Sequence, residues 1–170
     1  MRDMLFVAVM SFAAIGVGFF LYQYGPETLH IKLLGSDRSG GIAYTIVGEG
    51  VYAVGVDQTA NYRITNHEEL LQLWTLVYGN GGEVPALPHV DFKTEEILAI
   101  FDGTHSSGGY GVTVTKVSDA GGKRTISIMR TRPGDSCTPT LNITSPFQIL
   151  IIKKSTLPLD HTDQIVTTVC

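Results

Sequence analysis

The uncharged segment near the N-terminus limits most strongly what this chain can fold into. From Met4 to Tyr22 the sequence runs for 19 residues without a charged side chain. As an α-helix this segment would be about 28 Å long, close to the hydrocarbon thickness of a bilayer. Two tyrosines follow at the level of a membrane interface, and Gly25-Pro26 would end the helix. We therefore predict a transmembrane signal-anchor over residues 1–25, with residues 4–22 in the membrane.

A cleaved signal peptide is the alternative interpretation of the same segment. Ala14-Ile15-Gly16 offers small residues at the two positions that a signal peptidase reads. Cleavage there would leave the apolar residues 17–21 on the mature N-terminus, which favours the anchor. Under both interpretations the rest of the chain is exported. Arg2, placed before the apolar segment, weakly favours a single-pass protein of the cytoplasmic membrane whose domain lies on the extracytoplasmic side.

From residue 28 to residue 170 the pattern changes to short β-rich segments separated by glycine, with 19 Gly in the whole chain. Asp119-Ala120-Gly121-Gly122 lies between two alternating segments and predicts a hairpin. We therefore expect a mostly β, β-sandwich-like exported domain. The predicted strands are Leu29–Leu33, Ile42–Val47, Val51–Val56, Tyr62–Thr65, Ile97–Phe101, Tyr110–Val117, Arg124–Arg130, Phe147–Lys153 and Gln164–Val169.

One segment breaks the β pattern. Apolar residues recur at helical spacing from Leu70 to Tyr78, which predicts one α-helix at about 66–78. Thr65-Asn66-His67-Glu68 reads as a capping box in which the threonine oxygen accepts from the third helical amide. Trp74, the only tryptophan, lies on the apolar stripe, so we expect it to anchor the helix on a sheet.

The sequence carries no motif of an established catalytic, cofactor or metal site. Its five histidines lack the spacing of zinc ligands, and Walker, G-x-G-x-x-G and G-x-S-x-G patterns do not occur. We therefore expect neither a metal nor a cofactor. The net charge is -4, and the 12 Lys and Arg are spread along the chain, so nucleic acid is not an expected partner.

The most enzyme-like cluster, Asp102 with His105, Ser106 and Ser107, lies within one loop. A catalytic triad needs side chains that converge from separate elements, so we expect a polar turn and no catalytic residues. Such glycine-rich loops between strands commonly carry binding residues. The alternative that the glycines only shape the turn, with the tyrosine packed inward, stays open. We predict a partner-binding loop formed by Thr104, His105, Ser106, Ser107, Gly108, Gly109 and Tyr110.

Two cysteines, Cys137 and Cys170, would lie in an oxidising compartment if the domain is exported. A disulfide between them would close a loop of about 34 residues and stabilise the fold by about 3.7 kcal/mol in the chain-entropy model. Two free thiols explain the sequence equally well, so both possibilities remain open.

Several short motifs follow one another from about residue 61 to residue 153: Tyr62-Arg63-Ile64, the helix with Leu70 and Trp74, Leu87-Pro88-His89-Val90-Asp91-Phe92, Ile97–Gly103, Ser107-Gly108-Gly109-Tyr110 and Thr144-Ser145-Pro146-Phe147. Their order resembles the PrcB family, exported proteins whose namesake is an accessory subunit of a surface serine-protease complex. Each motif is weak alone, but their order and spacing agree. The resemblance implies a mostly β domain that binds or assists a partner protein and carries no catalytic residues. The anchor here is a helix rather than a lipid, and the glycine loop has serine where the family has threonine.

Three functions follow as hypotheses. The first is a membrane-tethered, non-catalytic protein-binding module, with a surface or membrane protease as the partner that the resemblance implies. The second is a peptidase inhibitor, because the Gly-Gly-Tyr loop is similar to the loop that chagasin-type inhibitors insert into cysteine-protease clefts. The third is a hydrolase that uses His105 and Ser107, for which the sequence encodes no site geometry.

Overall fold

A computed structural model of the chain describes residues 41–79, 84–138 and 140–170. By its internal contacts the chain divides into Met1–Ile31 and Lys32–Cys170, and every described residue belongs to the second unit. The predicted membrane segment 1–25 and the predicted strand 29–33 lie outside the described residues. Among the described residues, no helix combines the length and the apolar character needed to cross a bilayer.

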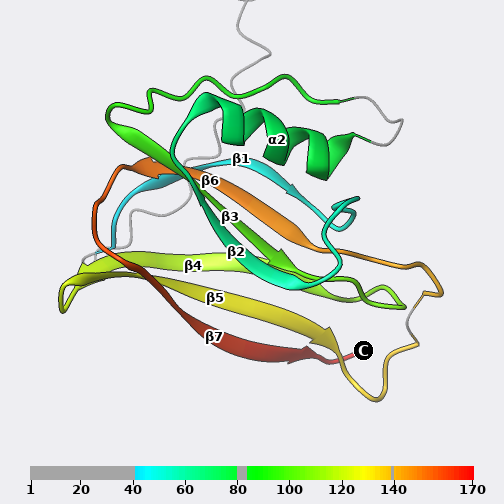
Figure 1. Cartoon of the computed structure of the whole chain (residues 1–170). Coiled ribbons are helices and arrows are strands. Elements are labelled where there is room, and N and C mark those ends of the chain that lie inside the picture. The colour runs from blue at the N-terminus through cyan, green and yellow to red at the C-terminus, as the bar shows by residue number, and fades with distance from the viewer. Residues whose placement is uncertain (1–40, 80–83, 139) are drawn as a thin grey trace, which may run out of the picture. The chain divides into compact units, whose positions relative to one another are not determined.

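The described residues form two sheets and one helix (Figure 1). The first sheet has the strand order β1-β6-β3-β2 and is antiparallel throughout. The second has the order β4-β5-β7, with β4 and β5 antiparallel and β5 and β7 parallel. This confirms the mostly β prediction with one helix. The elements are β1 (Tyr44–Gly50), β2 (Thr59–Ile64), α2 (His67–Tyr78), β3 (Glu95–Asp102), β4 (Gly111–Ala120), β5 (Lys123–Pro133), β6 (Phe147–Lys153) and β7 (Leu159–Thr168).

The four-stranded sheet is a middle layer, with α2 on one face and the three-stranded sheet on the other (Figure 1). Its inner strand β3 is therefore buried on both faces, which explains its continuous apolar sequence. Ile97, Ala99 and Phe101 belong to the core beneath the helix. Leu98 and Ile100 belong to the core between the two sheets. Strand β6 is shared in the same way, with Phe147 and Ile149 in the first core and Leu150 and Ile152 in the second, so the two cores share both inner strands.

The predicted hairpin is present between β4 and β5. Gly121 and Gly122 have φ values of 60° and 76°, the left-handed region that a two-residue hairpin turn requires and that glycine enters without strain. Side chains at both positions would face open space, so the backbone conformation alone selects glycine.

The helix is present, but its cap lies one residue later than predicted. The N-cap is Asn66, whose Oδ1 accepts from the Glu69 amide at 2.9 Å. The Glu69 carboxylate reaches back and accepts from the Thr65 amide at 2.9 Å. The prediction that Thr65 caps the helix was wrong, because the asparagine occupies the extended cap position and its side chain reaches the third helical amide.

The predicted strand Val51–Val56 is not formed. Two amides of this segment instead bind the last turn of the helix, Val54 N–H to Val77 O at 3.3 Å and Gly55 N–H to Leu76 O at 3.0 Å. The helix ends there, so it offers no amide that could donate to these carbonyls. This apolar segment therefore caps α2 and forms only an isolated bridge, between Tyr52 and Ser145, instead of a strand.

Strand β7 begins at Leu159, whereas the sequence predicted a start at Gln164. Its first half contains Asp160, His161 and Asp163, which lack strand-like alternation but pair in parallel with β5. After β7, Cys170 forms a disulfide with Cys137, which follows β5. The C-terminus is thereby tied to the connection between β5 and β6.

Trp74 is 4% exposed, and its Nε1 donates to Pro85 O at 2.8 Å. Its ring also contacts Tyr78, with ring centroids 4.8 Å apart. We predict that Trp74→Ala lowers the free energy of unfolding by about 3–5 kcal/mol, because the neighbouring core cannot fill the cavity. Urea denaturation of the full chain in detergent measures this loss. Leu71→Ala, on the exposed face of α2, is the control, and a loss below about 1 kcal/mol for Trp74→Ala would contradict the assignment.

Candidate functional site

Two pairs of buried opposite charges join the two sheets. On β3, Glu96 and Asp102 flank the apolar segment, and both side chains face the second sheet. On β5, Arg124 and Arg130 flank Ile126 and Ile128 in the same way. Glu96 pairs with Arg124 and Asp102 with Arg130, so the two ends of the inter-sheet core each carry an ion pair. The two carboxylates on β3 have the same sequence spacing as the two arginines on β5, so both ion pairs can form at once.

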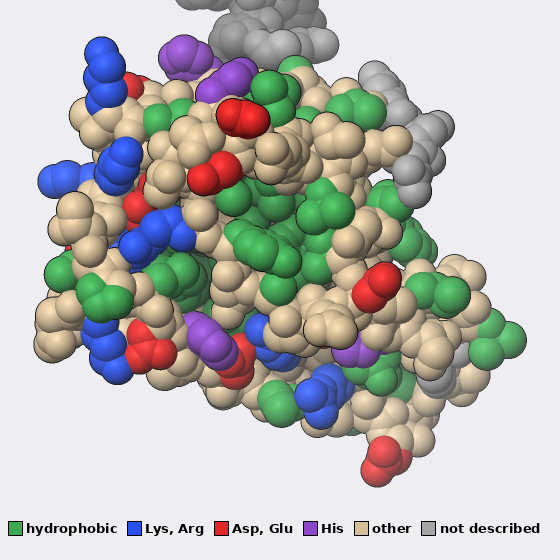
Figure 2. Space-filling view, in the orientation of Figure 1, with side chains coloured by type: hydrophobic (Ala, Val, Ile, Leu, Met, Phe, Trp, Pro, Cys, Tyr) green, Lys and Arg blue, Asp and Glu red, His purple; other side chains and the backbone are tan. Residues whose placement is uncertain are grey.

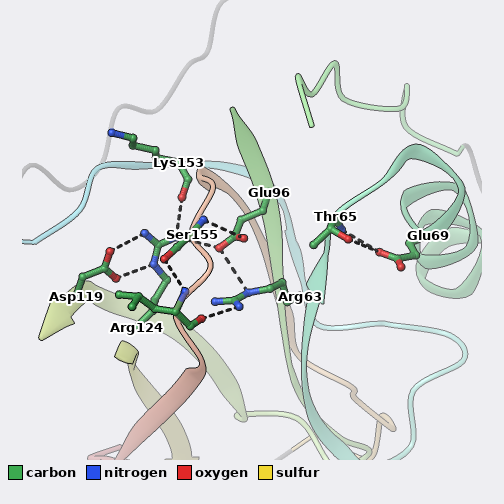
Figure 3. A network of polar contacts seen from close by, with 9 residues as sticks. Arg63, Thr65, Glu69, Glu96, Asp119, Arg124, Lys153 and Ser155 are labelled. Atoms are coloured by element: carbon green, nitrogen blue, oxygen red, sulfur yellow. Dashed lines mark hydrogen bonds and ion pairs between the residues drawn. The ribbon is translucent and has the colours of Figure 1, made fainter. Parts of the chain in front are cut away.

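Arg124 is the centre of the first group (Figure 3). Its Nε and Nη2 donate to the two oxygens of Asp119 at 2.8 and 2.9 Å, and its Nη1 donates to Glu96 Oε1 at 2.9 Å. The Arg124 side chain is 2% exposed and that of Glu96 is 0% exposed. Hydrogen bonding to Arg124 lowers the pKa of Asp119. Burial alone would lower the pKa of Arg124, but the two carboxylates outweigh it and raise the value.

Arg130 is the centre of a chain of polar contacts at the other end. Its Nη1 donates to Asp102 Oδ1 at 2.6 Å, and its Nε donates to Asp163 Oδ1 at 2.7 Å. Asp102 Oδ2 lies 2.7 Å from His105 Nε2, and Asp163 Oδ2 lies 2.6 Å from His161 Nδ1. Burial alone would raise the pKa of Asp163, but its bonds from Arg130 and His161 outweigh this and lower the value. The chain connects loop residue His105 to the outer strand β7.

The predicted binding loop is held to the segment that precedes β6. His105 N–H donates to Thr144 O at 2.7 Å, and Thr144 N–H donates to His105 O at 2.9 Å. Gly108 N–H donates to Thr140 O at 3.0 Å, and the Thr144 hydroxyl donates to Ser107 O at 2.8 Å. These hydrogen bonds attach the loop to the segment that leads into β6 of the four-stranded sheet.

The loop residues differ in exposure. Thr104, Ser106 and Gly109 are exposed, Gly108 is buried, and His105, Ser107 and Tyr110 are half-buried. The Tyr110 ring stacks flat on His105, with centroids 3.8 Å apart and planes inclined by 3°. Gly109 has a φ of 93°, and a Cβ there would lie 3.1 Å from Pro133 Cβ, so a side chain is strained at this position. The tyrosine therefore covers His105 instead of projecting from the loop.

The Asp102–His105 pair has two members of a catalytic triad, but among the described residues no serine or cysteine is hydrogen-bonded to His105. Ser107, the nearest candidate in the sequence, takes part through its carbonyl oxygen, which accepts from Thr144. Within residues 41–79, 84–138 and 140–170, its hydroxyl makes no hydrogen bond to His105. The described residues also contain no group of three or more His, Cys, Asp or Glu placed to hold a metal ion. The arrangement is suited to holding the loop in one conformation.

Exposed apolar side chains lie beside this loop, and sequence reasoning missed them. Leu141 is 95% exposed, Ile143 66% and Tyr52 59%. Bonds from Thr144 to His105 and from Ser145 to Val51 O place their segments at the same end of the domain as the loop. Figure 2 shows hydrophobic side chains protruding at the right-hand edge, toward which these loops run in Figure 1. We call Tyr52, Leu141, Ile143 and the exposed loop residues Thr104 and Ser106 the loop-end surface.

The charged pairs were also missed by sequence reasoning, although a signal was present. Arg124 and Arg130 occupy the inward positions of an alternating strand, where arginine is rare unless it is paired. Glu96 and Asp102 border the apolar segment of β3 with the same spacing. Two strands that each carry charges at both ends of an apolar stretch indicate matched pairing across a core.

The chain was compared with known protein families, curated proteins and solved structures. A family model described as PrcB C-terminal matches residues 97–153, from β3 through β6, including the predicted binding loop. This confirms the resemblance to the PrcB family over that segment. No curated protein and no solved structure matches the chain.

We predict that Arg124→Met lowers the free energy of unfolding by about 3–5 kcal/mol at pH 7, because it leaves the Glu96 carboxylate buried without its closest partner. The loss should shrink in acid. Asp119 has a pKa below its usual 3.8 in the folded protein, so its contribution is present above that value and disappears as the pH falls through the folded pKa. Urea denaturation from pH 7 to pH 3 measures both effects.

Lys123→Met is the matched control for this substitution. Lys123 is the neighbouring residue, and its ion pair with Asp160 is exposed, with side chains 52% and 44% accessible. Exposed pairs contribute little to stability, so this variant should unfold like the original protein. A small, pH-independent effect of Arg124→Met would show that the buried network does not stabilise the fold.

Proposed function

On the premise that residues 97–153 form a PrcB C-terminal domain, we propose that this chain is a membrane-tethered, non-catalytic protein-binding module. Its role would be that of an accessory subunit of an extracytoplasmic protease complex. The family match supports the general role. The loop-end surface supports binding of a protein at the end of the domain where the matched loop lies.

The exposure of Leu141, Ile143 and Tyr52 is the observation that carries the proposal. Apolar side chains that lie together in solvent commonly mark a contact with another protein, because covering them removes apolar area from water. Tyrosine beside aliphatic side chains is also typical of interface centres. The exposed residues Thr104 and Ser106 flank His105, which pairs with Thr144, and would form the rim of this group.

The conformation of the loop-end surface supports the same role. The segments that carry it are joined by backbone hydrogen bonds between His105 and Thr144 and between Ser145 and Val51. The His105 ring is further held by Asp102 on one edge and Tyr110 on one face. A surface that is ordered before binding loses less conformational entropy when the partner arrives.

Two features support a location outside the cytoplasm. The sequence from Met4 to Tyr22 has the length and apolar character of a membrane helix. The disulfide between Cys137 and Cys170 belongs to proteins of oxidising compartments. A domain tethered in this way would meet its partner at the outer side of the cytoplasmic membrane.

The geometry favours this proposal over the inhibitor and hydrolase hypotheses. An inhibitory loop must offer a projecting side chain to a protease cleft, whereas Tyr110 is half-buried and stacked on His105. A hydrolase needs a nucleophile beside its base, and Ser107 is not hydrogen-bonded to His105 in the described residues.

The test is capture of the partner by full-length tagged chain from detergent-solubilised membranes. We predict that Leu141→Ser combined with Ile143→Ser reduces the captured partner by about tenfold or more, because two interface side chains become polar. The folded state should stay within about 0.5 kcal/mol of the original, since both residues are surface residues. Quantitative mass spectrometry of the captured proteins measures the reduction.

Leu71→Ser combined with Val84→Ser is the control. These residues are 47% and 51% exposed but lie on and after α2. This pair should leave capture unchanged. Equal capture by the loop-end variant and the original protein would refute the proposed surface, and recovery of the full-length chain in the soluble fraction would refute the tether.

A further inference from the structure

Strand β2 is an open edge of the four-stranded sheet. It pairs only with β3, in an unbroken antiparallel register from Thr59 to Ile64. No backbone group of Thr59 to Arg63 bonds to any described segment other than β3. The edges β1 and β4 each contain a register shift that interrupts pairing with a further strand. Edge strands that lack bulges, proline or lysine are open to pairing with another chain.

A polar cavity lies on the face of β2 that is turned toward the second sheet. It has a volume of about 390 Å³ and lies between Thr59–Asn61 of β2 and the first half of β7. Asn61 Oδ1 and Arg130 Nη2 are buried at this cavity and have no hydrogen-bond partner in the described part of the chain. Arg130 is 6% exposed. Buried polar atoms are nearly always paired, so an unpaired acceptor and an unpaired donor on one cavity indicate a ligand that supplies both partners.

A second, apolar cavity lies on the opposite face of the same strand. It has a volume of about 360 Å³ and is lined by Tyr62 and Ile64 of β2 and by Leu73 and Leu76 of α2. Figure 2 shows hydrophobic side chains gathered in the middle of the visible face, where α2 and β2 meet in Figure 1. An open strand with one cavity on each face is suited to an added strand, whose side chains point alternately to the two faces.

We propose that β2 binds an extended segment of the partner protein as a fifth strand of the four-stranded sheet. An aliphatic or aromatic side chain of that segment enters the cavity under α2, and an Asn or Gln side chain enters the cavity at Arg130. This inference rests on the proposed protein-binding function and names a second contact. Because β2 follows Asp57, whose carbonyl accepts from Thr104 N–H at 3.0 Å, the bound segment would continue from the loop-end surface.

The charges around Arg130 select a carboxamide over a carboxylate. Asp102 and Asp163 already lie 2.6 and 2.7 Å from its guanidinium. A third carboxylate would face both and be repelled. A carboxamide is neutral, and its oxygen can accept from Arg130 Nη2 while its NH₂ donates to Asn61 Oδ1.

The test uses a displayed library of random twelve-residue peptides selected on the full chain in detergent. Selected peptides are then synthesised with single N-methyl groups along the backbone. We expect the effect of methylation on peptide affinity to alternate along the peptide. Methylation at every second residue removes a strand hydrogen bond and weakens binding about tenfold or more. Methylation at the residues between them has little effect. Fluorescence anisotropy of labelled peptides measures the Kd.

Asn61→Leu is the matching change in the protein. Its Oδ1 has no partner in the described residues, so leucine should leave the unfolding midpoint unchanged while it weakens peptide binding about tenfold. Thr113→Val, an exposed position on the edge strand β4, is the control and should not affect binding.

Four results would overturn the inference. One is a selection that enriches no peptide, and another is N-methyl sensitivity without a period of two. The third is a dimer of the full chain that Asn61→Leu converts to a monomer, since the edge would then bind a second copy. Peptides that lose binding with Leu141→Ser and Ile143→Ser but not with Asn61→Leu would also remove the edge contact, while leaving the proposed binding function in place.

Discussion

The buried contacts between carboxylates of β3 and guanidinium groups of β5 determine how the two sheets stack. A charge taken out of water is tolerated only where partners replace the lost hydration. Arg124 meets this condition through Asp119 and Glu96, and Arg130 through Asp102 and Asp163. A shift of one sheet along the other would break the Glu96–Arg124 and Asp102–Arg130 pairs and leave the two β3 carboxylates buried without these partners, whereas Asp119 and Asp163 would move with the arginines of their own sheet. The apolar contacts between the sheets do not select position in this way, because dispersion and hydrophobic burial are not directional.

The Asp102–Arg130 pair also holds the loop at the candidate binding end in place. Asp102 uses one oxygen for Arg130 and the other for His105, so the inter-sheet core and the loop share a carboxylate. His105 in turn carries the stacked Tyr110 and the backbone pairing with Thr144. Leu141 and Ile143 lie next to that pairing and are exposed. The same residues that fix the stack therefore also fix the surface that we propose for the partner.

Much of the fold was predictable from the sequence, because glycine turns and alternation report local structure directly. Strand β6 and the Gly121-Gly122 hairpin match their predicted positions. The failures involve long-range partners. The sequence of Val51–Val56 is typical of a strand, but the segment caps α2. The first residues of β7 are polar and do not predict a strand, yet they form one because they pair in parallel with β5. For the candidate site, the sequence indicated the loop 104–110 but not the apolar residues beside it, whose proximity depends on pairing across the chain between Ser145 and Val51.

Amide hydrogen exchange of the full chain tests most directly whether the binding end is an ordered part of the core. The His105 and Thr144 amides donate to each other's carbonyls, so we predict that they exchange as slowly as the amides of β3 to within about tenfold. The Leu141 amide, which has no hydrogen-bond partner in the described part of the chain, should exchange rapidly and serves as the internal reference. Rapid exchange at His105 and Thr144, equal to that of Leu141, would contradict the account, because the loop would then open independently of the charged pair that is said to hold it.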